Sequence, residues 1–263
     1  MNNVNQTLYI PLYGKAYVSR KGIILNDKKA EAIWEAEGFE LKGKSASKWL
    51  AYYMGMRSKV FDNWLEEKLN NTNDVVIIHI GCGMDSRVLR VAAGSHHWYD
   101  VDFPDVIKER RHYYRETDHY HMIEADVREE SWLNNISVKN HAIIVMEGVS
   151  MYFQSVELKA LFRNICKYFE KVELLMDCYT SFAAKASKYK NPINDVGVTS
   201  VYGLDDPKEL EQNINISYVK EHDMTPAELI DELEGAEKVI FKKLYGGNIS
   251  KKMYRMYEYK KEK

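Results

Sequence analysis

The sequence contains few cysteines, no long apolar run and no excess of charge of either sign. Its three cysteines, Cys82, Cys166 and Cys178, are an odd number in 263 residues and form no Cys-x-x-Cys pair. A disulfide framework is therefore not expected, and reduced thiols are typical of a cytosolic protein. No run approaches the ~20 apolar residues of a membrane span, and residues 1–6 are polar, unlike a signal sequence. We expect a cytoplasmic protein with no membrane partner.

The charge balance excludes one large class of partner. Lys and Arg number 37 and Asp and Glu number 39, which gives a net charge of -2 and a pI of about 6.5. Because nucleic-acid binding depends on a basic field, we do not expect a nucleic-acid partner. No internal repeat is present, and the length suits one α/β unit with an embellishment. The 19 tyrosines either line a pocket for an aromatic substrate or pack at core edges.

Residues 75–102 have the order of a nucleotide-binding unit. The β-branched run Val75–Ile80 predicts a buried strand, and Gly81 and Gly83 follow it in a tight turn before a short helix and a second strand. Asp102 ends that second strand, 21 positions beyond Gly81. Glycines let the backbone approach a ligand closely, and a carboxylate at this place can accept hydrogen bonds from both ribose hydroxyls. The stretch predicts a site for a ligand that contains a nucleoside.

Further strands and helices alternate after this unit. We expect strands at 120–124, 142–146 and 172–177, and helices at 105–115 and 156–169. This alternation predicts a parallel sheet with helices on both faces, where ligands bind at the carboxyl ends of the strands. Those ends carry Asp102, Asp126, Glu147 and Asp177, so we expect one shared cavity. The charged run 108–111 predicts a solvated outer face for the helix at 105–115.

The N-terminal region is predicted to be helical. Asp27 is the expected N-cap of a helix at 28–37, and a longer helix is expected at 47–69. The longer helix has an apolar face made of Leu50, Tyr53, Met54, Phe61, Trp64 and Leu65. Arg57 falls in the middle of this face. Two interpretations stay open: its guanidinium reaches out to water, or it pairs with a ligand anion held between this helix and the sheet.

The pattern loosens between residues 181 and 206, where Pro192, Gly197 and Gly203 interrupt it. This excursion is either a lid near the site or an inert surface segment. A strand is then expected near 214–220, followed by a helix at 226–245 that can break at Gly235. A last strand at 253–259 can run antiparallel at or near the sheet edge.

Four segments resemble the leucine carboxyl methyltransferase family: Ile80–Arg87, Tyr99–Pro104, Glu124–Arg128 and Met146–Tyr152. Residues 7–16, the segment at Asp27 and residues 202–207 are also similar, and the nearest branch resembles the O-methyltransferases of bacterial polyketide biosynthesis. The resemblance implies an enzyme, an S-adenosylmethionine-dependent O-methyltransferase that acts on a carboxylate or hydroxyl of a small molecule. It further implies a Rossmann-like, doubly wound α/β fold with seven strands, mostly parallel with the last antiparallel. Residues 1–72 would form an N-terminal helical cap integral to the site, and residues 73–263 the methyltransferase domain.

The same resemblance assigns roles to individual residues. Arg57 would pair with the methionyl carboxylate of the cofactor, and Gly81 and Gly83 would pass beneath its methionine part. The other cofactor residues would be Asp102 at the ribose, Asp126 and Val127 at the adenine, and Glu147 at the methionine. Tyr152 would close the pocket, and Arg128 would hold an acceptor carboxylate. Gly148 and Ser150 make their segment smaller than in the leucine-specific enzymes, so a protein-phosphatase substrate is not expected.

Two other functions fit parts of the sequence. An NAD-dependent oxidoreductase also has a strand, a glycine loop and an acid, but Ser86 occupies the third glycine position, and the Tyr-x-x-x-Lys pairs lie near the chain ends. A non-catalytic sensor or scaffold that binds S-adenosylmethionine would retain Arg57 and Asp102 without turnover. No metal site is expected, because the histidines at 96–97 and 119–121 lie at strand starts, away from the cavity. The sequence leaves the oligomeric state and the acceptor open.

Overall fold

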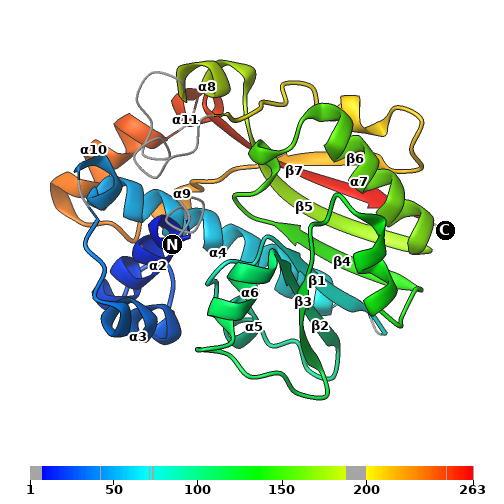
Figure 1. Ribbon diagram of the computed structural model, residues 1–263. Coiled ribbons are helices and arrows are strands. Elements are labelled where there is room, and N and C mark those ends of the chain that lie inside the picture. Colours follow the sequence, from blue (N-terminus) through cyan, green and yellow to red (C-terminus); the bar gives the residue numbers. More distant parts are fainter. Residues whose placement is uncertain are drawn as a thin grey trace.

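The computed structural model describes residues 8–41, 43–70, 72, 74–187, 200–246 and 248–262. Within these residues, seven strands form one sheet in the order β3-β2-β1-β4-β5-β7-β6 (Figure 1). The strands are β1 (Val76–Ile80), β2 (His97–Asp102), β3 (Tyr120–Glu124), β4 (His141–Met146), β5 (Lys171–Tyr179), β6 (Ser217–His222) and β7 (Tyr254–Lys261). β7 pairs antiparallel with both β5 and β6, whereas every pairing among β1 to β5 is parallel. The predicted Rossmann-like fold is confirmed, and the antiparallel last strand lies one position in from the edge.

Helices precede, connect and follow these strands. The α-helices are α2 (Tyr9–Lys21), α3 (Lys28–Glu37), α4 (Lys48–Asn70), α5 (Arg87–Arg90), α6 (Pro104–Arg110), α7 (Ser155–Tyr168), α8 (Ser181–Ala186), α9 (Ala227–Ile230), α10 (Gly235–Tyr245) and α11 (Asn248–Lys251). Short 3-10 helices are η1 (Gly43–Ala46), η2 (Glu130–Asn135), η3 (Ser150–Tyr152) and η6 (Pro207–Glu211). The Asp27 cap is as predicted, because its Oδ1 accepts from Ala30 N at 2.8 Å. Among the described helices, none combines the length and apolarity needed to cross a membrane.

The register brings the carboxyl ends of the central strands to one edge. Ile80 at the end of β1 pairs with Val101 of β2 and with Met146 of β4. Gly81, Asp102 and Glu147 each lie one position beyond these three residues in the sequence. In a parallel sheet such a register places the strand-end side chains around a common space. For Gly81, Asp102 and Glu147, the expectation of a shared cavity therefore has a direct geometric basis.

The two faces of the sheet are buried by different helices. Ile77 belongs to an apolar cluster with residues of α2, α3, α4 and α10, whereas Ile78 belongs to a cluster with residues of α7. This alternation explains why β1 is apolar throughout, since a central parallel strand has both faces covered. Figure 1 shows α2, α3, α4 and α10 grouped at one side of the molecule. The boundary at 72 that divides cap from domain stays a prediction.

Helix α6 differs from the helix predicted at 105–115 in its length and in the burial of one charged residue. It ends at Arg110 rather than at residue 115, and the Arg110 side chain is fully buried, so the prediction of a solvated face is wrong for this residue. Its guanidinium forms an ion pair with Asp100 of β2 and donates to the carbonyl oxygen of Gly83 at 2.9 Å. A local charge pattern does not reveal such a partner, because Asp100 reaches Arg110 only once β2 and α6 pack together. The pair holds the glycine turn against α6.

The excursion at 181–206 is described only in part, since residues 188–199 lie outside the described residues. Residues 181–186 form α8, and the returning segment runs beside β5. Leu204 N donates to Tyr179 O at 2.8 Å, and Tyr202 N donates to Met151 O at 2.8 Å. These bonds fix the segment next to the strand ends. Whether the excursion acts as a lid stays a prediction. Further along the chain, the predicted break at Gly235 is confirmed, because α9 ends before it and α10 begins there with φ +51°.

Candidate functional site

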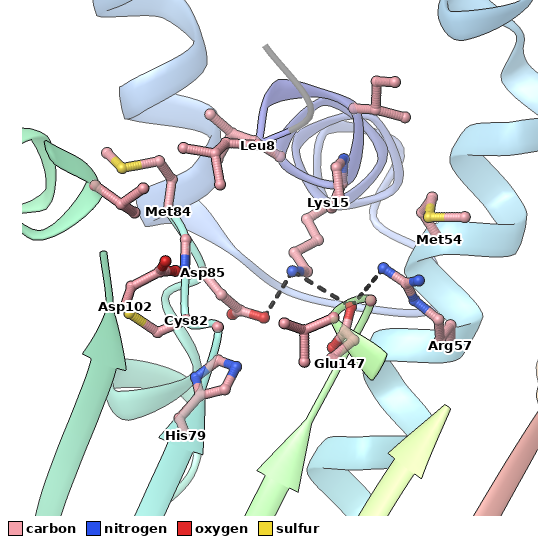
Figure 2. A pocket seen from close by; sticks show the side chains of 18 of the residues that line it. Leu8, Lys15, Met54, Arg57, His79, Cys82, Met84, Asp85, Asp102 and Glu147 are labelled. Atoms are coloured by element: carbon pink, nitrogen blue, oxygen red, sulfur yellow. Dashed lines mark hydrogen bonds and ion pairs between the residues drawn. The ribbon is translucent and has the colours of Figure 1, made fainter. Parts of the chain in front are cut away.

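Three adjoining cavities, all lined by described residues, lie at the carboxyl edge of the sheet. The central cavity, of about 200 Å³, lies between α2, α4 and the ends of β1, β2 and β4 (Figure 2). The β3 cavity, of about 400 Å³, shares Gly81, Asp102 and Tyr152 with it and continues to Val127. A third cavity, of about 420 Å³, shares four residues with the central one and extends on the other side. We name it the tyrosine cavity, because Tyr53, Tyr179, Tyr245 and Tyr254 line it.

The floor of the central cavity is backbone. Gly81 has φ +68°, and a Cβ built there would lie 2.8 Å from Val149 Cγ2. Gly148 has φ +73°, and its Cβ would lie 3.3 Å from the guanidinium nitrogens of Arg57. Both positions therefore require glycine for conformation and for space. The predicted role of the glycine turn, close approach of the backbone to a ligand, matches this geometry.

Arg57 points from α4 into the site rather than out to water. Its side chain is 3% exposed, so the interpretation that it reaches solvent is wrong. Its Nη2 lies 3.1 Å from Glu147 Oε1, and its Nη1 lies 3.1 Å from Asp177 Oδ2. Burial alone would lower the pKa of Arg57, but these two carboxylates raise it above the ordinary value. Arg57 is a fixed cation at the wall of the central cavity.

Lys15 of α2 is a second buried cation, and its role was not predicted. Its Nζ lies 2.6 Å from Asp85 Oδ2 and 3.6 Å from Glu147 Oε1. Figure 2 shows Lys15 and Arg57 converging on Glu147 from two different helices. The signal in the sequence was a lone lysine at an i+3 position from Leu12 in an otherwise apolar helical stretch. Among the residues that the structure describes, Lys15 and Arg57 are the only Lys or Arg residues that line the central cavity.

A wider network of ion pairs fixes the acids of the site. Arg87 of α5 pairs with Glu147, and its Nε donates to Asp62 Oδ1 at 2.7 Å. Arg90 pairs with Asp85 at 2.9 Å and with Asp27 at 2.6 Å. Burial would raise the pKa of Glu147, but Lys15, Arg57 and Arg87 hold that pKa well below the ordinary range. The acid at the end of β4 therefore stays ionised. Few of these pairings could be read from the sequence, because the partners are far apart along the chain.

Asp102 lies between the central cavity and the β3 cavity. Its Oδ2 accepts from Gly83 N at 2.8 Å, and its Oδ1 accepts from Phe103 N at 2.8 Å. Desolvation raises the pKa of Asp102 to about 6, although both backbone bonds oppose the shift. Each carboxylate oxygen keeps a second lone pair that can accept a hydrogen bond from a hydroxyl group. This placement matches the ribose-binding role that the resemblance implies.

The other predicted residues separate into two groups. Glu147 and Tyr152 line the central cavity, whereas Asp126, Val127 and Arg128 line the β3 cavity. Arg128 Nη1 lies 2.9 Å from Asp126 Oδ2, its Nε lies 3.0 Å from Glu157 Oε1, and its guanidinium lies over the Phe153 ring. Arg128 does not line the tyrosine cavity. The structure therefore places it on the opposite side of the central cavity from the tyrosines.

The tyrosine cavity is apolar and aromatic. Its residues Leu50, Met54, Tyr179 and Tyr254 also line the central cavity, so the two spaces meet there. The Tyr254 hydroxyl lies 3.5 Å from Arg57 Nη1, and the Tyr254 ring meets that of Tyr179 edge-on at 4.7 Å. Burial, together with the nearby Asp177 charge, holds the pKa of Tyr254 well above its usual value. The described residues that line this cavity include no carboxylate and no histidine.

The sequence is similar to those of known methyltransferases. The family model for leucine carboxyl methyltransferase matches residues 9–166. The tetracenomycin polyketide synthesis O-methyltransferase TcmP of Streptomyces glaucescens is 28% identical over 217 residues, which are 81% of this chain and 80% of that protein. The S-adenosyl-L-methionine-dependent methyltransferase dpfgK of Gibberella zeae is 27% identical over 237 residues, again 81% and 80%.

A solved structure with the same fold is magnesium protoporphyrin IX methyltransferase from Synechocystis with bound SAH. It has a TM-score of 0.53 at 10% identity, and the match covers 94% of this chain and 97% of that one. A SAM-dependent methyltransferase from Anabaena variabilis has a TM-score of 0.53 at 11% identity, covering 79% and 84%. At such low identity these structures establish the likeness of fold alone.

Proposed function

Because the chain belongs to the leucine carboxyl methyltransferase family, we propose that it transfers a methyl group from S-adenosylmethionine to a carboxylate oxygen of a small molecule. The enzyme class and the cofactor are those of a methyltransferase that uses S-adenosylmethionine. The choice of a carboxylate, rather than a hydroxyl, rests on one observation: the described lining of the tyrosine cavity contains no carboxylate and no histidine to act as a base.

The residues of the central and β3 cavities fit the cofactor. Asp102 would accept from the ribose hydroxyls, Val127 would pack on the adenine, and Lys15 and Arg57 would hold the carboxylate of the methionyl part. Arg57 Nε is a buried donor with no hydrogen-bond partner among the described residues, and Glu147 Oε1 meets Arg57 and Lys15 as ion pairs but accepts no hydrogen bond, so hydrogen-bonding capacity remains for a ligand. When bound, the cofactor supplies a methyl group on a positively charged sulfur, which is activated for in-line displacement.

The protein's own task is then to position the acceptor and to exclude water. The tyrosine cavity meets the central cavity at Met54, Tyr179 and Tyr254, and the acceptor oxygen would lie at this junction. The Tyr254 hydroxyl can donate a hydrogen bond to a carboxylate there. Its raised pKa keeps it protonated, so it serves as a donor and not as a base.

A phenol would need a base, and the described lining of the tyrosine cavity contains neither a carboxylate nor a histidine. Glu147, which lines the central cavity, and Asp177 are each paired with Arg57. A carboxylic acid has an ordinary pKa of about 4 and is ionised near neutral pH without help, whereas a phenol has a pKa of about 10. The acceptor role predicted for Arg128 stays a prediction, and its pairing with Asp126 favours a place on the adenine side.

Two measurements test the proposal. Calorimetry should show that S-adenosylhomocysteine binds and that NAD does not; micromolar NAD binding without S-adenosylhomocysteine binding would overturn the assignment. Mass spectrometry after incubation with S-adenosylmethionine and a mixed library of acids and phenols should then find methyl esters. If only phenol ethers form, the carboxylate acceptor is wrong. If cofactor binds but no extract or library yields S-adenosylhomocysteine, the protein is a sensor or scaffold instead.

A further inference from the structure

We propose that the tyrosine cavity takes an acceptor with fused aromatic rings that carries a second anionic group, and that Lys44 of η1 binds this group. The inference rests on the proposed function, since it assumes that the tyrosine cavity is the acceptor site. It names the shape and charge of the acceptor, and it assigns a specificity role to a residue outside the cofactor site.

The cavity walls favour a flat ring system. Four tyrosines line the space, and three pairs of them are already in ring contact. Tyr254 contacts Tyr179 at 4.7 Å and Tyr53 at 6.3 Å, and Tyr53 contacts Tyr245 at 5.5 Å between centroids. The remaining wall includes Met54 and other apolar side chains. Aromatic rings gain binding free energy from edge or stacked contacts beyond that of area burial, and thioethers also pack well on rings. Such walls favour an aromatic acceptor over an aliphatic one of equal length.

The size of the cavity also favours an acceptor with fused rings. Its volume of about 420 Å³ lies within the range of about 300–1,000 Å³ that is typical of small-molecule sites. A single amino acid or a short acid would leave much of this space to water. A compound of two or more fused rings, with one carboxylate at the junction near Tyr254, would extend toward the far end of the cavity.

Lys44 supplies a positive charge to the tyrosine cavity, outside the part that this cavity shares with the central one. It lines the tyrosine cavity but not the central one, and it is exposed at the surface. It has no ion pair with any residue that the structure describes, whereas Lys48, at the start of α4, pairs with Glu237 at 2.7 Å. Because the described lining includes no carboxylate to neutralise Lys44, its ammonium group is available to an anion of the ligand.

Binding of defined probes to the protein saturated with S-adenosylhomocysteine tests the inference. The probes are naphthalene-2,6-dicarboxylic acid, 2-naphthoic acid and octanedioic acid, measured by calorimetry. The naphthalene diacid should bind roughly fivefold more tightly than 2-naphthoic acid, because an exposed charge pair contributes up to about 1 kcal/mol. It should bind about tenfold more tightly than octanedioic acid, which has two carboxylates but no rings.

Variants test whether Lys44 and the tyrosine cavity are responsible for the binding of these probes. Lys44→Met should abolish the advantage of the diacid over 2-naphthoic acid, while Lys185→Met, an exposed lysine of α8 that does not line the cavity, should preserve it. Ala186→Trp, which adds bulk to the exposed rim of the cavity, should weaken both naphthalene acids and leave S-adenosylhomocysteine binding unchanged. Equal diacid preference in Lys44→Met, or naphthalene binding untouched by Ala186→Trp, overturns the inference.

Binding of S-adenosylhomocysteine distinguishes a failure of this inference from a failure of the proposed function on which it rests. If S-adenosylhomocysteine binds but neither naphthalene acid does, or if octanedioic acid binds as tightly as the naphthalene diacid, the aromatic acceptor is wrong and the methyltransferase assignment stands. If S-adenosylhomocysteine itself fails to bind the wild-type protein, the proposed function fails and this inference fails with it.

Discussion

Lys15 Nζ and Arg57 Nη2 approach the same atom, Oε1 of Glu147, at 3.6 and 3.1 Å. The two cations come from α2 and α4, while the acid directly follows β4 at the edge of the sheet. Helices from the N-terminal region thus complete a site that begins at the strand ends. Buried ion pairs of this kind are costly to desolvate and contribute little net stability, so their retention is better explained by a ligand that uses the charges.

Arg57→Met should weaken S-adenosylhomocysteine binding by about 2–5 kcal/mol, because it removes one of two cations available to the ligand carboxylate. The variant should also unfold at a lower temperature, since Glu147 and Asp177 stay buried without their partner. Calorimetry well below the unfolding transition measures affinity, and circular dichroism measures stability. The exposed Arg20→Met is the matched control. An unchanged affinity in Arg57→Met would remove this residue from the cofactor site.

Lys15→Met should also weaken S-adenosylhomocysteine binding, by about 1.5–3 kcal/mol, the range for a hydrogen bond to a charged group. The structural reason is that Lys15 is the only described lysine in the lining of the central cavity. Lys21→Met is a suitable control, because Lys21 lies on the same helix but pairs with Glu237 away from the cavity. Equal losses in the two variants would mean that Lys15 only stabilises the fold.

The sequence predicts the local parts of this site and misses the long-range ones. The Gly81 turn and Asp102 could be found because their spacing along the chain is the signal itself. Arg57 was conspicuous as a charge on an apolar helix face. Lys15 and Arg110 were not recognised, since each owes its role to a carboxylate that reaches it only through packing: Asp85 for Lys15, and Asp100 for Arg110.

The same contrast between local and long-range features determines how much of the fold can be predicted. β-branched runs such as that of β1 predict strands, and their alternation with helices predicts the parallel order. The abundance of tyrosine allows a tyrosine-lined pocket as one of two alternatives, but the sequence does not indicate which tyrosines form the tyrosine cavity. Its walls come from α4, β5, α10 and β7, which are distant in sequence, and nothing in the local pattern of Tyr53 or Tyr254 indicates that they share a space.

Cofactor affinity should depend on pH through Asp102. Its folded-state pKa is raised to about 6, so the carboxylate is ionised at pH 7 and largely protonated at pH 5. A raised acid pKa means that the protonated form favours folding, and this contribution is lost as the pH rises through about 6. Ribose recognition needs the ionised acceptor, so S-adenosylhomocysteine affinity should fall by up to about tenfold from pH 7 to 5. Calorimetry should show that Asp102→Asn binds S-adenosylhomocysteine more weakly and that its affinity no longer changes between pH 7 and 5. If the variant keeps this pH dependence, another group causes it.

Arg128→Ala should raise the Michaelis constant for S-adenosylmethionine severalfold and leave that for the acceptor nearly unchanged. The reason is its position in the β3 cavity, where it holds Asp126 at 2.9 Å. Steady-state kinetics with each substrate varied in turn measures both constants, and Arg163→Ala, at an exposed position of α7, is the control. The opposite result, with only the acceptor constant raised, would restore the acceptor-binding role that the sequence suggested.

The rate of methyl transfer at saturating cofactor should be nearly flat from about pH 6 to 9. A carboxylic acid with a pKa of about 4 is fully ionised throughout this range, so no further acceptor is created as the pH rises. Tyr254 adds no step, because its pKa lies well above its usual value and its hydroxyl stays a donor. Tyr254→Phe should lower the rate at every pH by a similar factor, since it removes a hydrogen bond and not a titrating group. A wild-type rate that climbs about tenfold per pH unit would instead mean that a phenol must lose its proton before transfer, and the carboxylate acceptor would have to be abandoned.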